Sequence, residues 1–206
     1  MVNVIGGSCK HQDLLREKQA IRVVESVYNG ELPSGQGLNQ ETNLKRSCDT
    51  RWSSHYNILI SLIDMFPSII DVLDTIANDG ATSEQKGEAE HLSHFIQSFG
   101  FMFNLHLMRY ILGVSNELSQ ALQRKDQDIV NPMKLVRMSK ERLQIMRENG
   151  RSSLLDEVST FCGINEIVVP NMDNIFVARG RSRHYTNGMT NLHYYRVELF
   201  YAIIDM

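Results

Sequence analysis

A chain of 206 residues is long enough to bury a hydrophobic core, and its 42% hydrophobic and 22% charged residues are ordinary for a globular protein. The formal net charge of -3 excludes a general basic field that would collect nucleic acid, so any such contact has to be local. Three widely separated cysteines exclude a disulfide framework and a cysteine-based zinc site, and the lack of an apolar run of about 18 residues excludes a membrane span.

The first long helix is predicted between Ser8, which can serve as its N-cap, and about Asn29, where Gly30 ends it. Residues 31–42 have no period and are rich in turn-forming residues, which predicts a loop after this helix. The apolar residues of the helix fall near one face, and its charged residues leave a solvated back. The expected packing face carries Leu14, Ile21, Val24 and Tyr28, and the expected solvated face carries Arg16, Glu17, Lys18 and Arg22.

Helical periodicity returns after Trp52 and continues to residue 122. Residues 53–65 and 68–78 form two helical patterns that Pro67 interrupts, which predicts two helices, or one kinked helix, ending at Asp79 and Gly80. The pair Thr82 and Ser83 suits the start of another helix, whose apolar positions lead to Gly100. Residues 101–122 form the densest apolar segment, apolar almost all round in its first half, which predicts the central helix of a bundle.

The last third of the chain combines further helices with an irregular stretch. Asn131 and Pro132 suit an N-cap and a first helical position, and the pair at residues 149–150 is expected to end that helix. A short further helix is expected to stop at Gly163. Periodicity is lost over residues 164–191, where 167–169 indicate a short extended piece. A last helix is expected over residues 192–206, with apolar positions at Tyr195, Leu199, Ala202 and Ile203.

Together these patterns predict a mainly α protein, a multi-helix bundle of about eight helices with little or no sheet. Residues 1–47 hold the N-terminal helix and a Gly-rich loop, and residues 48–163 hold the helical bundle. Residues 164–206 hold an irregular basic loop and the C-terminal helix. We expect all three parts to form one domain.

The only tryptophan, Trp52, follows Arg51 at the junction between the Gly-rich loop and the long helical run. In one interpretation the ring anchors the start of a helix and Arg51 pairs with Asp49, because a lone tryptophan usually supplies buried area. In the other, the two residues contact nucleic acid, because an aromatic face can stack on an unpaired base and an arginine can hold phosphate.

Three arginines, Arg179, Arg181 and Arg183, stand beside glycine and serine in the irregular stretch. A flexible cationic strand of this kind could follow a nucleic-acid backbone, which makes it the best phosphate candidate in the sequence. The alternative is a surface loop without a ligand.

No pattern in the sequence predicts catalysis, a cofactor or a small-molecule substrate. His91 and His94 share a helical face that could seat two metal ligands, but no further ligand stands at a telling spacing. Surface histidines beside acidic residues are the better account, so no metal site is predicted. Cys162 lies in an apolar run and is expected in the core, and neither a GxSxG nor an SxxK motif occurs.

Six stretches of the sequence carry a resemblance to a known family: residues 7–10, 37–42, 49–52, 118–131, 168–172 and 191–201. They resemble the plant hAT-superfamily transposases, which often carry a TTF-type zinc finger upstream and are labelled zinc finger MYM-type protein 1-like. The resemblance covers nearly the whole chain, and the run at residues 118–131 is its most specific part. This sequence departs from the family pattern at residues 47–48 and at Pro132.

The resemblance implies a non-catalytic fragment. Such transposases cut DNA with an RNase H-like domain whose two Asp and one Glu bind divalent metal, and a helical domain is inserted before the Glu. In the family an Arg-Trp motif at the start of this insertion contacts the DNA end, and it matches Arg51 and Trp52 here. The chain is expected to hold the insertion region without the catalytic triad, the zinc finger or the dimerisation region. A nuclear location follows from the resemblance, and a cytoplasmic one from the lack of a signal peptide alone.

Three hypotheses follow. The first is a truncated transposase-derived protein, non-catalytic alone, that contacts a transposon end or a DNA hairpin through Arg51, Trp52 and the basic loop. The second is a helical interaction module that binds protein, including itself or a relative of the same family. The third, an independent metal-dependent nuclease, is disfavoured because no carboxylate triad is found. None of them involves a membrane.

Overall fold

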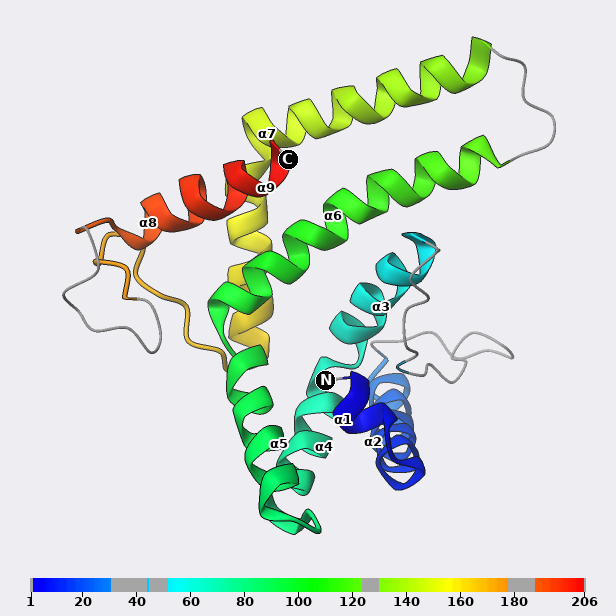
Figure 1. Cartoon of the computed structure of the whole chain (residues 1–206), viewed down its shortest axis with the longest axis vertical. Helices are drawn as coiled ribbons and strands as arrows, with labels where there is room; N and C mark the ends of the chain where they lie inside the picture. The colour runs from blue at the N-terminus through cyan, green and yellow to red at the C-terminus, as the bar shows by residue number, and fades with distance from the viewer. Residues whose placement is uncertain (1, 31–43, 45–51, 124–129, 178–187, 206) are drawn as a thin grey trace. The chain divides into compact units, whose positions relative to one another are not determined.

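The computed structural model describes residues 2–30, 44, 52–123, 130–177 and 188–205. It is mainly helical, and the described residues form no strand (Figure 1). The prediction of a multi-helix protein of about eight helices with little or no sheet is confirmed. The chain divides into two compact units, Met1–Ile96 and Gln97–Met206. The sequence-based divisions at residues 47 and 163 stay predictions.

The first unit is built around α4. Its helices are α1 (Val2–Gly6), α2 (Cys9–Tyr28), α3 (Trp52–Asp64), α4 (Phe66–Asp79) and α5 (Ser83–Ile96). Pro67 lies in the first turn of α4, where its missing N–H costs no helical hydrogen bond, so it starts the helix that follows α3. Helices α2, α3 and α5 all contact α4. The buried residues of α4 are Phe66, Ser68, Ile69, Val72, Leu73 and Ile76.

Helix α2 has the predicted bounds, with Ser8 at its N-cap and Gly30 just beyond its end at φ +74°. Its predicted packing face is wrong. The hydroxyl of Ser68 donates to Gln19 Oε1 at 2.8 Å, and Arg22, expected on the solvated face, pairs with Asp71 of α4 at 2.9 Å. Of the residues in α2, only Leu15 is buried. Three residues of the expected packing face are instead exposed: Ile21, Val24 and Tyr28.

The second unit is built on the pair α6 (Phe99–Leu122) and α7 (Val130–Ile164), which run side by side in opposite directions (Figure 1). Helix α6 contains the apolar run predicted to be the central helix, and its buried residues include Met102, Phe103 and Leu107. Its N-cap is Ser98, whose hydroxyl accepts a hydrogen bond from the N–H of Phe101 at 3.3 Å.

The predicted helix end at Asn149 and Gly150 is wrong, because α7 runs without interruption through these residues. Figure 1 shows that α7 changes direction part-way along its length. Beyond this region Leu154, Val158 and Cys162 recur every four residues and are all buried. The short helix predicted around residues 154–161 is therefore the second arm of a longer one.

The C-terminal helix begins as predicted but winds differently. It consists of α8 (Asn191–His193), the π-helix η2 (Tyr194–Tyr201) and α9 (Ala202–Ile204). In a π-helix the hydrogen bonds join residues five apart, and the two buried side chains of η2, Tyr195 and Phe200, have this spacing. The extended piece predicted at residues 167–169 forms no strand, although Ile167 is buried.

Candidate functional site

The residues predicted to touch DNA lie largely outside the described part of the chain. Arg51, Arg179, Arg181 and Arg183 are outside the described residues. Trp52 is the first residue of α3, but its side chain is not described. What the structure describes of the predicted interface is therefore the residues on either side of it.

The basic segment, residues 178–187, is flanked on both sides by residues that contact one another, 174–176 and 189–191, which we call the frame. Ile175 and Thr190 form an antiparallel bridge, in which the N–H of Phe176 donates to Met189 O at 2.8 Å and the N–H of Asn191 donates to Asn174 O at 2.8 Å. The Thr190 hydroxyl also caps α8 by accepting from the N–H of His193 at 3.2 Å. The described residues on the two sides of the basic segment are thus held together at the start of the C-terminal helix.

Aromatic side chains pack this frame against η2 and α6 within the second unit. Phe176, just before the basic segment, stacks on Tyr194 of η2 with ring centroids 3.6 Å apart and an interplanar angle of 10°. The ring of the next residue, Tyr195, packs against Phe99 and Phe103 of α6 with centroid distances of 5.0 Å and 5.3 Å. Sequence analysis missed this cluster, because neither the stacking of Phe176 nor the π-winding of η2 follows from a local pattern.

A pocket of about 340 Å³ opens beside the frame. None of its lining residues carries a formal charge at neutral pH, and most of them are apolar or aromatic. Such a surface suits an apolar group, and its lining includes no His, Asp, Glu, Lys or Cys. The lining residues are Ser98, Phe99, Gly100, Val168, Pro170, Phe176, Val177, Asn191, Tyr194 and Tyr195.

A second polar cluster lies between α6 and α7. The buried side chain of His106 has its Nδ1 2.9 Å from Glu157 Oε1, and Arg109 pairs with the same oxygen. Burial lowers the pKa of His106, whereas the hydrogen bond and charge of Glu157 raise it. His106 Nε2 is buried without a hydrogen-bond partner among the described residues, and the rings of His106 and Phe161 form a T-shaped pair with centroids 5.1 Å apart.

His106 has the orienting carboxylate of a catalytic dyad, but among the described residues it makes no hydrogen bond to a serine, threonine or cysteine that it could activate. Cys162, which also lies on α7, is fully buried as predicted. Burial raises the pKa of this thiol to about 11, so it is almost entirely protonated and unreactive at neutral pH. The described residues contain no group of three or more His, Cys, Asp or Glu that could hold a metal ion, and His91 and His94 lie exposed on α5.

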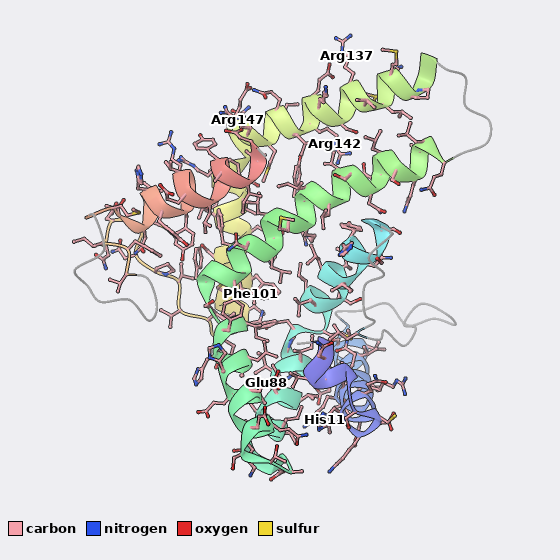
Figure 2. The ribbon with its side chains drawn as sticks, in the orientation of Figure 1. His11, Glu88, Phe101, Arg137, Arg142 and Arg147 are labelled. Carbon is pink, nitrogen blue, oxygen red and sulfur yellow. The ribbon has the colours of Figure 1, made fainter. Side chains whose placement is uncertain are left out.

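Ion pairs neutralise most of the described arginines of the second unit. Figure 2 shows three of these arginines along α7. Residues 97–206 contain 13 Lys and Arg against 11 Asp and Glu, a net +2, while residues 1–96 contain 8 against 13, a net -5. The pairs are Arg109 with Glu157, Arg137 with Glu141, Arg142 with Glu117, and Arg147 with Asp205.

Comparison with known proteins adds no identification. No protein-family model matches the sequence, and no solved structure matches the chain. Among the described residues, no helix is both long enough and apolar enough to cross a membrane.

Proposed function

We propose that this chain is a transposase-derived helical protein that does not cut DNA by itself and contacts a transposon end or DNA hairpin. The contact runs through Arg51 and Trp52 and through the three arginines of residues 178–187. The same proposal places the protein in the nucleus and includes association with itself or with a relative. The resemblance to plant hAT-superfamily transposases supplies the DNA partner.

The observation that carries the proposal is the frame around the basic segment. The described residues on either side of the segment are joined by the bridge between Ile175 and Thr190, and Phe176 is stacked on Tyr194. Recognition residues are often found on loops that a rigid scaffold positions, and holding both ends of a loop lowers the entropy lost on binding. Three arginines within five residues would then face one phosphate backbone together.

The paired state of the other arginines also supports this assignment. An arginine held by a carboxylate has to give up that partner, or share it, before it can bind phosphate. Four described arginines of the second unit are in such pairs. Among the cations of residues 97–206 outside these four pairs, the three arginines of the basic segment form the closest group of three in the sequence, which favours this segment as the source of charge for DNA.

Fluorescence anisotropy of the 206-residue chain with a labelled DNA hairpin and a random duplex tests the proposal. We expect hairpin affinity to fall about tenfold or more when Arg179, Arg181 and Arg183 are all replaced by alanine, and also to fall with Trp52→Ala. The matched control removes the same charge from α7 by replacing Lys134, Arg137 and Lys140. Equal affinity in the wild type and the basic-segment variant, with unchanged circular dichroism, would contradict the DNA contact.

A second candidate function, a helical module that binds protein, is favoured by one observation. Ile21, Val24 and Tyr28 stand three and four residues apart on α2, so they form one exposed apolar stripe. Apolar stripes of this spacing are the usual contact of helix-to-helix association. Sedimentation velocity of the wild type and of Val24→Glu separates the candidates, since self-association through α2 should be lost in the variant. A monomer at every concentration would argue against self-association.

A further inference from the structure

The bridge beside the pocket leaves a free backbone edge. In this antiparallel bridge the hydrogen bonds come from the residues on either side of the bridged pair, so Ile175 and Thr190 are a non-hydrogen-bonded pair and the N–H and C=O of Ile175 point away from Thr190. By the same alternation the N–H of Val177 points outward. Within the part of the chain that the structure describes, the backbone N–H groups of Ile175 and Val177 donate no hydrogen bond.

The side chains next to this edge are apolar and face solvent. Ile175 is 59% exposed, Val177 is 51% exposed and Val168, across the pocket, is 84% exposed. The edge is a single extended bridge and no full strand, but an unpaired extended backbone with exposed β-branched residues is likewise a template for pairing with another chain. No described residue pairs with this edge, and Phe176 and Val177 connect it directly to the pocket.

We propose that an extended segment of a partner protein docks on this edge. Its backbone pairs with the outward groups of Ile175 and Val177, and one bulky apolar side chain enters the pocket. Strand addition works in this way: main-chain hydrogen bonds supply affinity, and a pocket for an alternate side chain supplies selectivity. The interaction goes beyond the proposed DNA contact and does not depend on it.

The chemistry of the pocket favours a peptide over nucleic acid. A nucleotide brings a phosphate that needs a cation, and no Lys or Arg is among the lining residues. The polar groups that line the pocket are hydroxyls and one amide, and the amide of Asn191 already donates to Asn171 O at 2.8 Å. An uncharged side chain, aromatic or aliphatic, is the group that this lining accommodates.

Two substitutions separate pocket filling from edge pairing. A Cβ at Gly100 would meet only the Tyr195 hydroxyl, at 3.6 Å, so Gly100→Leu can place its side chain in the pocket without clashing with the backbone. This change also removes a glycine from a helix, which favours the fold. Val177→Pro removes the outward N–H that pairing requires. Ile145→Thr serves as the control, because it changes an apolar residue of α7 that is as exposed as Ile175.

A phage library of random peptides, selected on the 206-residue chain, supplies the probe. The selected peptide is then synthesised, and its affinity is measured by isothermal titration. We expect selected sequences to alternate β-branched residues around one bulky apolar residue. Their affinity should fall about tenfold or more with Gly100→Leu, with Val177→Pro and with N-methylation of the peptide backbone, but not with Ile145→Thr.

Three results would overturn the proposal. One is a selection that enriches no sequence, and another is an enriched peptide whose affinity neither pocket nor edge variant changes. The third is an oligothymidine that binds the wild type and is lost with Gly100→Leu, which would assign the pocket to a nucleobase. Thermal melting of each variant shows whether the fold is kept, and the effect of peptide N-methylation on the wild type does not depend on any protein variant.

Discussion

His106 is held neutral by its surroundings. Its side chain is buried between α6 and α7, and burial lowers its pKa more strongly than Glu157 raises it. The unfolded chain takes up this proton at about pH 6.5, whereas the folded chain takes it up only at lower pH. The unfolded state therefore binds more protons between these two values, and folding stability falls as the pH falls through that window.

The resulting prediction concerns the pH dependence of unfolding. In urea denaturation followed by circular dichroism, the free energy of unfolding of the wild type should decrease as the pH falls below about 6.5. His106→Gln removes the titrating group, so the decrease should be smaller in this variant. His193→Gln, which replaces an exposed histidine of the same unit, is the control and should follow the wild type. Parallel curves for all three proteins would show that His106 does not titrate in this window.

Single residues whose role is local are predictable from the sequence. Ser8 and Thr82 precede helix starts in the structure as predicted, Pro67 marks the break between α3 and α4, and Gly30 lies just beyond a helix end. Capping and left-handed turns depend on one residue and its immediate neighbours, so they can be predicted without the rest of the fold. The partners of His106 are about 50 residues away in the sequence, and no local pattern predicts them.

At the level of the element, Gly150 shows why a local signal can fail. Asparagine followed by glycine is a common helix ending, but α7 continues through this pair. The glycine has another role there, because a Cβ at residue 150 would lie 2.0 Å from the Sδ and 3.1 Å from the Cγ of Met146. Met146 is buried, so Gly150 leaves room for a core side chain one helical turn earlier.

This role predicts the sign of a substitution. Alanine is the better helix former by about 0.5–1 kcal/mol, whereas overpacking a core costs about 1–3 kcal/mol. We therefore expect Gly150→Ala to destabilise the protein by about 1 kcal/mol. In a Met146→Ala background the clash is absent, so the same change should stabilise by about 0.5–1 kcal/mol. Urea denaturation of the four proteins forms a double-mutant cycle, and the absence of a sign reversal would rule out the steric role.

Helix faces were predicted less well than helix bounds. In α2 the apolar stripe is exposed, and Gln19 and Arg22 face α4 through side-chain hydrogen bonds. In η2 the π-winding buries Phe200, which is five residues after Tyr195, instead of the predicted Leu199. The predicted packing faces assumed an apolar contact surface with α-helical spacing. A polar interface and an altered winding each break that assumption.

For the whole molecule, the net charge of -3 conceals a division. Residues 1–96 carry a net -5 and residues 97–206 carry a net +2. Overall charge alone predicted weak attraction to DNA, yet the half with the aromatic frame and the basic segment is the cationic one. The composition limits non-specific binding through long-range attraction, and it leaves open a contact made by a few arginines at short range.

Salt dependence distinguishes these two modes. Each phosphate that an arginine neutralises contributes about 0.9 to the slope of log affinity against log salt concentration for duplex DNA. If all three arginines of the basic segment contact phosphate, replacing them by alanine should reduce the magnitude of this slope by about 2.7. Replacing Lys134, Arg137 and Lys140 should leave the slope unchanged, because these residues are not assigned a phosphate contact. The slopes are obtained by repeating the hairpin titration at four or more salt concentrations. Equal reductions in both variants would indicate attraction to the overall charge, and no reduction in either would place the basic segment away from DNA.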